Sequence, residues 1–261
     1  MPAPVLTQPS PARLALPQVT LAAATSVAPL ATARALARSM DLVDFGEVLW
    51  ISDLAPPEEI AGRVRWERIA PLTSRDAYSR YMLRDLAGMV RTEFVLCAQW
   101  DGYVVDPAAW RAEFLDHDYI GAVWPHFSEM TVGNGGFSLR SRRLLEACRD
   151  LPNQRGEAED VFICRSMRPR LEAEHGIRFA PPALAQAFAY ERERPSRPTF
   201  GFHGVFNLVK LVPDREAAAL IGELPRHALA RSELRELVAL ALRSGSWRTL
   251  LELARRWRRW L

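Results

Sequence analysis

A short apolar run delivers one carboxylate to the middle of this sequence. Residues 94–98 have the length and the residue types of a buried strand, and Gln99, Trp100 and Asp101 follow directly. In open α/β sheets, ligand sites form where buried strands end in polar side chains. The same letters also fit a strand that ends in a tight turn, because Asp-Gly is ordinary turn chemistry.

Two further places carry groups that could exchange a proton or hold a cation. Glu159 and Asp160 precede an apolar helix start, so the helix dipole would keep Asp160 ionised and able to accept a proton from a hydroxyl group. Acidic residues in a first helical turn are equally common for structural reasons. His203 lies between aromatic residues and glycines, in a cramped loop that would aim its imidazole, although a lone histidine is more often structural.

A glycine cluster lies between these groups in the sequence. Gly133, Gly135 and Gly136 remove side chains where the backbone must turn or approach another group closely. The cluster is not a P-loop, because no Lys-Ser or Lys-Thr pair follows it, and it lacks the spacing of a dinucleotide-binding fingerprint. We therefore exclude P-loop hydrolysis and oxidation with a nucleotide cofactor.

Strand and helix patterns alternate through most of the chain and would position these groups. This alternation predicts an α/β/α sandwich with a mixed, mostly parallel sheet. The predicted strands cover residues 18–25, 47–52, 64–69, 94–98, 118–122 and 137–139; the predicted helices cover 29–40, 75–91, 107–114 and 141–148; residues 178–187 are predicted to be a strand or a loop broken by prolines.

Two of these elements carry residues that would suit a nucleotide. The small side chains around Thr25, at the end of the first strand, would let a flat ligand approach the backbone. Ser79 shares a helix face with Arg75, Arg80 and Arg84, a set that could serve a diphosphate. Tight packing at the strand end and a solvated helix face explain the same residues without a ligand.

The two ends of the chain differ from its middle. Residues 1–17 are rich in proline and predict a disordered leader before a sandwich domain at 18–213. Residues 214–261 show amphipathic helical patterns and predict a helical appendage. Its last segment, 246–261, combines arginine with tryptophan, which suits an anionic membrane surface. A terminal helix docked on the domain with a solvated basic face is the alternative.

Composition limits the class of protein. The chain of 261 residues has 34 Lys and Arg and 31 Asp and Glu, for a net charge of +3. The basic residues of the C-terminal segment occur without a nucleic-acid recognition motif, so we expect no nucleic-acid partner. Cys97, Cys148 and Cys164 lack metal-binding spacing and predict reduced core residues of a cytosolic protein. No apolar run would span a membrane, which predicts a cytoplasmic protein, with peripheral contact to the inner membrane face through segment 246–261.

The segments that carry these groups resemble the DUF5672 type of protein domain, which is similar to glycosyltransferases. The matching segments are LCAQWDGYVV, DYIGAVW, VGNGGFSLRSRRLLEAC, EDVFIC and FGFHG, and they occur in the expected order within residues 19–206. The resemblance implies a GT-A fold, a sandwich that uses a nucleotide-sugar donor, most often together with Mn²⁺ or Mg²⁺. We expect a UDP-sugar as the donor.

The resemblance also implies a role for each matching residue. Asp101 matches the last acid of the DxD metal motif, with Gln99 in the place of the first, and His203 matches the C-terminal histidine that completes the metal site. In the xED motif of inverting enzymes, Asp160 would be the general base and Glu159 would help hold the acceptor. The predicted donor-binding residues are Thr25, Ser79, Gln99, Trp100, Gly135 and Gly136, and the predicted acceptor-binding residues are Asn134, Trp124 and Glu159.

Together these inferences predict a glycosyltransferase that moves a sugar from a nucleotide-sugar donor to a hydroxyl acceptor. The reaction would be inverting and assisted by Mn²⁺ or Mg²⁺, in polysaccharide or glycoconjugate biosynthesis. A non-catalytic domain of the same fold, which binds a sugar or a nucleotide, is the alternative.

Overall fold

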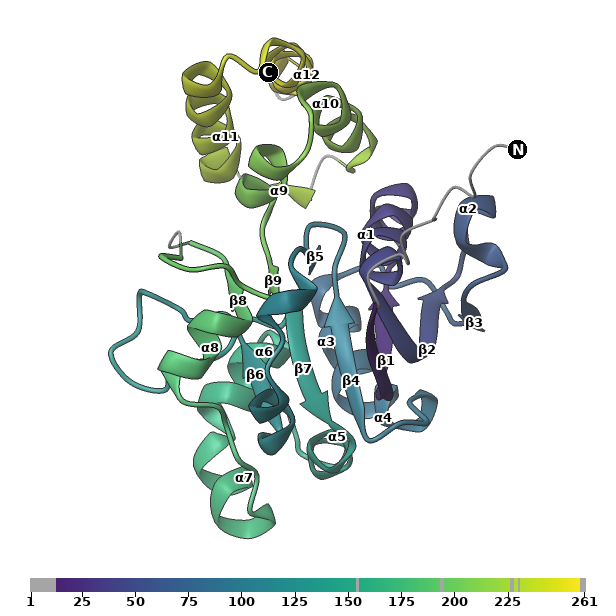
Figure 1. The fold of residues 1–261 in the computed structure, drawn as a ribbon, viewed down its shortest axis with the longest axis vertical. Coiled ribbons are helices and arrows are strands. Elements are labelled where there is room, and N and C mark those ends of the chain that lie inside the picture. The colour runs from purple at the N-terminus through teal and green to yellow at the C-terminus, as the bar shows by residue number, and fades with distance from the viewer. Residues whose placement is uncertain (1–12, 154, 193–194, 226–227, 230, 259–261) are drawn as a thin grey trace, which may run out of the picture.

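A six-stranded sheet forms the centre of the molecule (Figure 1). The computed structural model describes residues 13–153, 155–192, 195–225, 228–229 and 231–258. In spatial order the strands of the sheet are β3 (Arg65–Arg68), β2 (Val43–Ser52), β1 (Leu14–Ala24), β4 (Phe94–Ala98), β7 (Phe137–Ser141) and β6 (Tyr119–Gly121).

The sheet is mixed but mostly parallel. β1 pairs in parallel with β2 and β4, and β2 pairs in parallel with β3. β7 runs antiparallel to both β4 and β6. Helices cover both faces, so the predicted α/β/α sandwich is confirmed.

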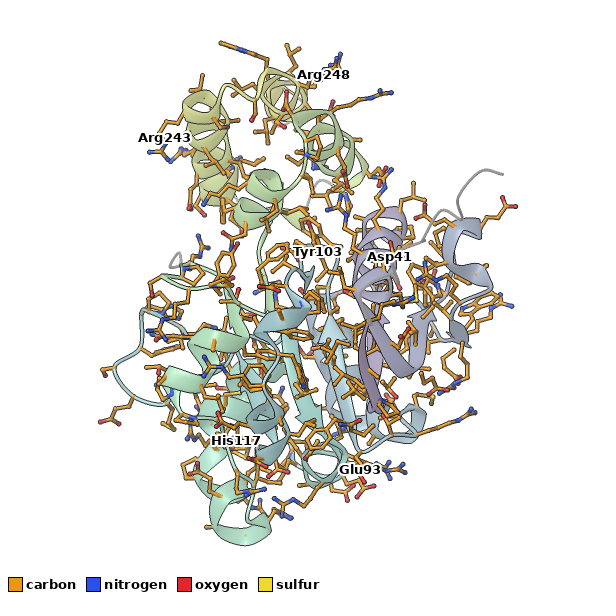
Figure 2. All side chains as sticks on the ribbon, viewed as in Figure 1. Asp41, Glu93, Tyr103, His117, Arg243 and Arg248 are labelled. Carbon is orange, nitrogen blue, oxygen red and sulfur yellow. The ribbon has the colours of Figure 1, made fainter. Side chains whose placement is uncertain are left out.

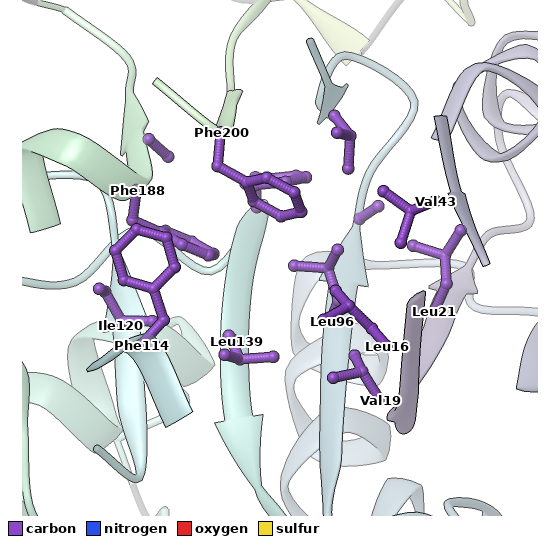
Figure 3. Packing of buried hydrophobic residues seen from close by; sticks show 14 of the residues in the cluster. Leu16, Val19, Leu21, Val43, Leu96, Phe114, Ile120, Leu139, Phe188 and Phe200 are labelled. Atoms are coloured by element: carbon purple, nitrogen blue, oxygen red, sulfur yellow. The ribbon is translucent and has the colours of Figure 1, made fainter. Parts of the chain in front are cut away.

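One face of the sheet is covered by α1 (Pro29–Leu42), by α8 (Pro182–Phe188) and by two 3₁₀ turns, Pro107–Ala109 and Ala112–Asp116. Leu21 and Leu96 of the central strands pack in one cluster with Phe188 of α8 (Figure 3). Leu36 of α1 belongs to the same cluster. All four side chains are fully buried.

The opposite face is covered by α3 (Arg75–Arg84), α4 (Leu86–Met89) and α5 (Arg142–Cys148). Val95 and Cys97, which alternate with Leu96 along β4, pack there against Met82 and Leu86. Because β4 is buried on both faces, its sequence is continuously apolar. A neighbouring cluster adds α6 (Glu159–Val161), the π-helical turn Phe162–Ser166 and α7 (Arg168–His175).

Serine side chains fix the starts of α3 and α5. The hydroxyl of Ser74 accepts a hydrogen bond from the backbone N–H of Ala77, and that of Ser141 accepts one from Leu144. Each bond satisfies an N–H that lacks a partner within the helix. The predicted helix at 141–148 is therefore confirmed, with Ser141 as its cap.

A second, smaller sheet joins distant parts of the chain. It consists of β5 (Tyr103–Val104), β9 (Gly201–Phe202) and β8 (Ala189–Tyr190), in that order. Tyr103 pairs with Phe202 in antiparallel orientation, and Tyr190 pairs with Phe202 in parallel. The residues that flank these three strands therefore meet at one edge.

The C-terminal part of the chain is helical, as predicted, and lies above the sandwich in Figure 1. It contains α9 (Val205–Leu211), α10 (Asp214–Glu223), α11 (Arg231–Ser244) and α12 (Trp247–Arg258). Their apolar faces form one cluster, which also includes Ala31 and Ala35 of α1 and Phe202 of β9. An ion pair of 2.6 Å between Arg38 and Glu216 ties α10 to α1. None of the helices described is long and apolar enough to cross a membrane.

Four local predictions were wrong. β1 begins at Leu14, so the last residues of the predicted leader belong to the sheet, while residues 1–12 lie outside the described part of the chain. Residues 182–188 form the helix α8, because Pro181 and Pro182 occupy its cap and first turn, where proline is tolerated. The predicted helix at 107–114 consists of 3₁₀ turns, and the one at 75–91 divides into α3 and α4 at Asp85.

Candidate active site

A pocket of about 310 Å³ opens at the carboxyl ends of β1 and β4. The chain leaves β1 toward β2 on one side, whereas β4 lies on the other side, so this is the switch point where open α/β sheets bind ligands. Thr25, Gln99 and Trp100 line the pocket together with Tyr78 and Arg75. The structure thus brings three of the predicted donor-binding residues to one cavity.

Hydrogen bonds hold Gln99 in the wall of this pocket. Its side-chain amide donates to the hydroxyl of Tyr78 over 3.1 Å, and its backbone N–H donates to the carbonyl of Gly136 over 2.8 Å. Burial, followed by the negative charge of Glu159, raises the pKa of Tyr78 far above its usual range. Tyr78 is therefore a neutral hydroxyl in the pocket, and Gln99 is anchored to it.

Asp101 and His203 lie side by side just beyond this wall. Asp101 precedes β5 and His203 follows β9, and Oδ1 of Asp101 is 3.3 Å from Nε2 of His203. The backbone also joins them, because the N–H of Gly204 donates to the carbonyl of Asp101 over 3.0 Å. Both side chains are largely buried, at 10% and 14% exposed.

A second carboxylate reaches His203 from the opposite side. Glu191 follows β8, and its Oε1 is 3.5 Å from Nδ1 of His203. Burial lowers the pKa of His203, but Asp101 and Glu191 outweigh it and raise that pKa to about 10. Without a bound metal ion the imidazole is thus a cation held between two carboxylates, and a metal ion that binds Nε2 would replace the proton on that nitrogen.

The predicted glycine loop lies directly against this group. A Cβ added to Gly136 would be 2.0 Å from Nε2 of His203, so a side chain there would occupy the place of the imidazole. Asn134 has a φ of 59°, a left-handed conformation, and its side chain accepts a hydrogen bond from the N–H of Gly136 over 3.3 Å. The loop can approach His203 because it carries no side chain at position 136.

The same loop reaches the predicted base on its other side. The backbone N–H of Gly135 donates to Oδ2 of Asp160 over 2.8 Å. A Cβ at Gly135 would be 2.3 Å from Oε1 of Glu159. The glycine pair therefore connects the Asp101–His203 pair to the two acids of α6, although these residues are far apart in sequence.

Glu159 faces the interior instead of the pocket. Its Oε1 is 2.8 Å from Nη2 of Arg140, and the two side chains are 6% and 0% exposed. Burial and the nearby charge of Asp160 raise the pKa of Glu159, and Arg140 opposes both effects. This position does not support the predicted contact between Glu159 and an acceptor, because the carboxylate is already bound to Arg140.

Two other predicted contacts also have different surroundings. The hydroxyl of Ser79 accepts a hydrogen bond from the backbone N–H of Glu159 over 3.2 Å, and Ser79 is fully buried, so it supports α6 and does not line the donor pocket. Trp124 is 6% exposed, and its ring packs against Gly133, where a Cβ would be only 2.1 Å from ring atoms. Trp124 therefore supports the glycine loop from behind.

Asp101 and His203 fit a divalent cation. Oδ1 of Asp101 and Nε2 of His203 are buried without a hydrogen-bond partner, and both are good metal ligands. Their separation of 3.3 Å is close to the ~3 Å between neighbouring ligands of an octahedral ion at ~2.1 Å. No group of three or more His, Cys, Asp or Glu side chains suited to a metal occurs in the described ranges, so other ligands would have to come from water or substrate.

Sequence reasoning missed Glu191 and the cavity beside it. The cavity has a volume of about 550 Å³, and its lining includes Arg111, Gln186, Tyr190, Glu191 and Arg197. No local motif marks Glu191, which lies in a run of charged residues. The pairing of β8 with β9, which only the structure reveals, places Glu191 beside His203.

Comparison of the sequence with protein families identifies the family of this chain. DUF5672, a family of proteins of unknown function, matches residues 63–203 of the chain. The chain belongs to the DUF5672 family. The DUF5672 match includes Asp101, the glycine loop, Asp160 and His203, and confirms the resemblance predicted from the motif segments. It ends before α9, so the helical segment lies outside it. The comparison with curated proteins gives no match.

Solved structures similar to this DUF5672 protein include three transferases. A glycosyltransferase involved in glycosylation of the major capsid of PBCV-1 has a TM-score of 0.44 at 13% identity, over 71% of this chain and 91% of that chain. A mannosyltransferase from Pyrobaculum calidifontis, in complex with GDP-Man and Mn²⁺, has a TM-score of 0.44 at 14% identity, over 96% of this chain and 78% of that chain. The galactosyltransferase LgtC, in complex with donor and acceptor sugar analogs, has a TM-score of 0.41 at 11% identity, over 84% of this chain and 99% of that chain.

Proposed function

We propose that this protein is a glycosyltransferase that moves a sugar from a nucleotide-sugar donor to a hydroxyl acceptor, with inversion at the anomeric carbon. The observation that carries the proposal is the glycine pair: Gly136 packs on His203 of a cation-binding pair, and Gly135 hydrogen-bonds to Asp160. One loop thus joins a place for a leaving diphosphate to a place for a general base.

The donor would bind at the switch point of the sheet. Its nucleoside would occupy the pocket lined by Thr25, Tyr78 and Trp100, and its diphosphate would face Asp101 and His203. We take a UDP-sugar as the donor to be tested first. Arg75, which also lines the pocket, would attract the negative phosphates.

The cation, Mn²⁺ or Mg²⁺, would be held by Asp101 and His203, and when bound it would stabilise the charge that develops on the leaving diphosphate. Asp160 would accept the proton of the acceptor hydroxyl as that oxygen attacks the anomeric carbon from the face opposite the diphosphate. The bond from Gly135 to Asp160 would orient the carboxylate for this transfer.

The acceptor would approach along the side of the loop that carries Asn134. Burial raises the pKa of Glu191, but His203 and, to a smaller extent, Arg192 and Asn134 lower it overall. The loop that carries Asn134 is thus close to Glu191, which lines the 550 Å³ cavity. Water must be excluded when donor and acceptor meet, or hydrolysis of the donor would compete with transfer.

Replacement of the base tests the proposal. We expect Asp160→Asn to reduce release of nucleoside diphosphate from a donor and acceptor mixture by roughly 10²- to 10⁴-fold, while donor binding, measured by calorimetry, is retained. Asp150→Asn is the matched control, because Asp150 is exposed on the last turn after α5. Turnover by Asp160→Asn equal to that of the wild type would show that Asp160 is not the base.

A non-catalytic binding domain is the second candidate, and Gln99 favours it. Where a second metal-binding acid would be expected, Gln99 instead donates a hydrogen bond to Tyr78. Mass spectrometry of the protein incubated with donor mixtures separates the two functions. A binding domain would retain intact donor and would not release nucleoside diphosphate in the presence of any acceptor.

The helix α12 supports a location on the cytoplasmic face of a membrane, where polysaccharides or glycoconjugates are assembled. Trp247 and Leu251 are 68% and 61% exposed, and Arg248 lies on the outer side of the helical segment (Figure 2). Apolar and basic side chains together suit anionic lipid. We expect Leu251→Asp to weaken sedimentation with vesicles that contain anionic lipid, and equal sedimentation of both proteins would contradict the membrane contact.

A further inference from the structure

Glu191 has no role in the proposed function, yet it contacts the residue on which the cation site depends. Its Oε1 is 3.5 Å from Nδ1 of His203, and Nε2 on the other side of the ring is 3.3 Å from Asp101. The Glu191 side chain is 20% exposed. The imidazole therefore lies between the two carboxylates, with one next to each ring nitrogen.

The backbone fixes Glu191 and His203 as neighbours. Tyr190 of β8 pairs with Phe202 of β9, and the N–H of His203 donates to the carbonyl of Tyr190 over 2.9 Å. The residues that follow these two strands are Glu191 and His203 themselves. The backbone pairing of the small sheet therefore sets the relative position of Glu191 and His203.

The side chain of Asn207 also joins Glu191 and His203. Its side-chain amide donates to the carbonyl of Glu191 over 2.5 Å and to the carbonyl of His203 over 2.8 Å, and Asn207 is 4% exposed. Both amide hydrogens are used to connect these two residues. A buried side chain devoted to this connection indicates that the arrangement is built into the fold.

We propose that Glu191 is a positioning residue for the cation site. Its carboxylate lies 3.5 Å from Nδ1 of His203. With a cation bound, it would accept the Nδ1–H, which fixes the ring and leaves the lone pair of Nε2 for the cation beside Asp101. A histidine that binds a metal through one nitrogen commonly donates its other N–H to a carboxylate, which sets the tautomer and increases the basicity of the ligand. This role rests on the proposed function, because it presumes that Asp101 and His203 hold a divalent cation.

Glu191 acts through the ring and not as a third ligand. It faces Nδ1, whereas Asp101 faces Nε2, so the imidazole lies between the two carboxylates. The effect of Glu191 should therefore be seen in how well His203 binds the cation.

Calorimetric titration of the full chain with Mn²⁺ alone, without donor, tests the proposal. We expect Glu191→Ala to weaken Mn²⁺ binding by about 10- to 100-fold. Glu191→Gln keeps the shape and one acceptor oxygen, so it should lose less affinity than Glu191→Ala. Glu216→Gln is the matched control, because Glu216 is similarly exposed at 27% but pairs with Arg38, and it should bind Mn²⁺ like the wild type.

Electron spin echo spectroscopy of bound Mn²⁺ gives a second readout that a merely structural residue would not change. The wild type should show the coupling of a histidine nitrogen, His203→Gln should lack it, and Glu191→Ala should show it weakened or lost. Thermal unfolding of each variant identifies loss of folding, and Glu191→Gln remains informative if Glu191→Ala does not fold.

Equal Mn²⁺ affinity and equal nitrogen coupling in the wild type and both Glu191 variants would overturn the proposal. A wild type that binds no Mn²⁺ would overturn it as well. If the wild type binds no Mn²⁺, release of nucleoside diphosphate should then be measured in the presence of a chelator. Release under these conditions would show that glycosyl transfer does not need the cation. Failure of this proposal and failure of the proposed function are therefore distinguishable.

Discussion

Arg140 is the residue on which the candidate base depends most directly. It is fully buried, and besides its ion pair with Glu159 it donates to the hydroxyl of Ser138 over 3.0 Å. A buried charge is costly unless it is paired, so Arg140 and Glu159 each require the other. Because Glu159 directly precedes Asp160, this pair also holds the candidate base in place.

Removal of Arg140 should therefore destabilise the protein strongly. We expect Arg140→Met to lower the free energy of unfolding by about 3–5 kcal/mol, because Glu159 would be left as an unpaired buried charge. Urea unfolding followed by circular dichroism measures this free energy of unfolding. Arg170→Ala, which breaks an exposed pair with Glu174, is the control and should cost less than about 1 kcal/mol. Recovery of stability in the double variant with Glu159→Gln would support the assigned cause, whereas similar losses for Arg140→Met and Arg170→Ala would contradict it.

His203 predicts how stability changes with pH. The pKa of His203 is raised to about 10 in the folded protein from about 6.5 when unfolded. Its contribution is thus fully present below pH ~6.5 and is lost as the pH rises toward 10. In metal-free protein, the unfolding midpoint should fall over this range, and His203→Gln should reduce the slope. Parallel curves for the two proteins would show that His203 is not the cause.

Glu191 shows where residue-level prediction from sequence fails. Asp101, Asp160 and His203 stand beside apolar strands, a helix start or glycines, so their local sequence gives a reason to select them. Glu191 stands in a charged run, and its importance comes from the pairing of two-residue strands that no periodicity could reveal.

At the scale of elements, the glycine loop is the connection between the two halves of the site. We expect Gly136→Ala to displace His203, since the new Cβ would be 2.0 Å from the ring, and to weaken Mn²⁺ binding by at least tenfold. Gly88→Ala is the control. Gly88 lies in α4 with nothing within 4 Å of an added Cβ, so alanine there should leave Mn²⁺ binding unchanged and stabilise the helix slightly. Unchanged Mn²⁺ affinity in Gly136→Ala would mean that the loop yields without moving His203.

Elements with strong local signals could be predicted from the sequence, and elements set by tertiary contacts could not. The strand at residues 94–98 agrees with β4 because a continuous apolar run between polar ends has few alternatives. The helix α8 has no clear signal in the sequence because Pro181 and Pro182 break most elements, although proline in a first helical turn costs no hydrogen bond. The small sheet has strands of two residues, too short for any pattern.

At the scale of the whole molecule, the helical segment is packed as part of the fold. Leu253 of α12 is 1% exposed, whereas Leu251 on the same helix is 61% exposed. We expect Leu253→Ala to reduce the free energy of unfolding by about 2–5 kcal/mol and Leu251→Ala to change it by less than about 0.5 kcal/mol. Urea unfolding of both variants makes the comparison. Equal effects would show that α12 does not pack through Leu253.

Ala228, which lies between α10 and α11, is part of the lining of the pocket at the carboxyl ends of β1 and β4. The rim of that pocket is therefore assembled from residues inside the stretch that matches the family, at 72–100, and from residues outside it, at 24–32 and at Ala228. Relatives that share the matched stretch but carry a different C-terminal region would then present a different pocket rim to a ligand. Chimeras that exchange the chain after Val212 keep Asn207, and they should accordingly change which ligand the pocket binds while leaving Asp101 and His203 in place.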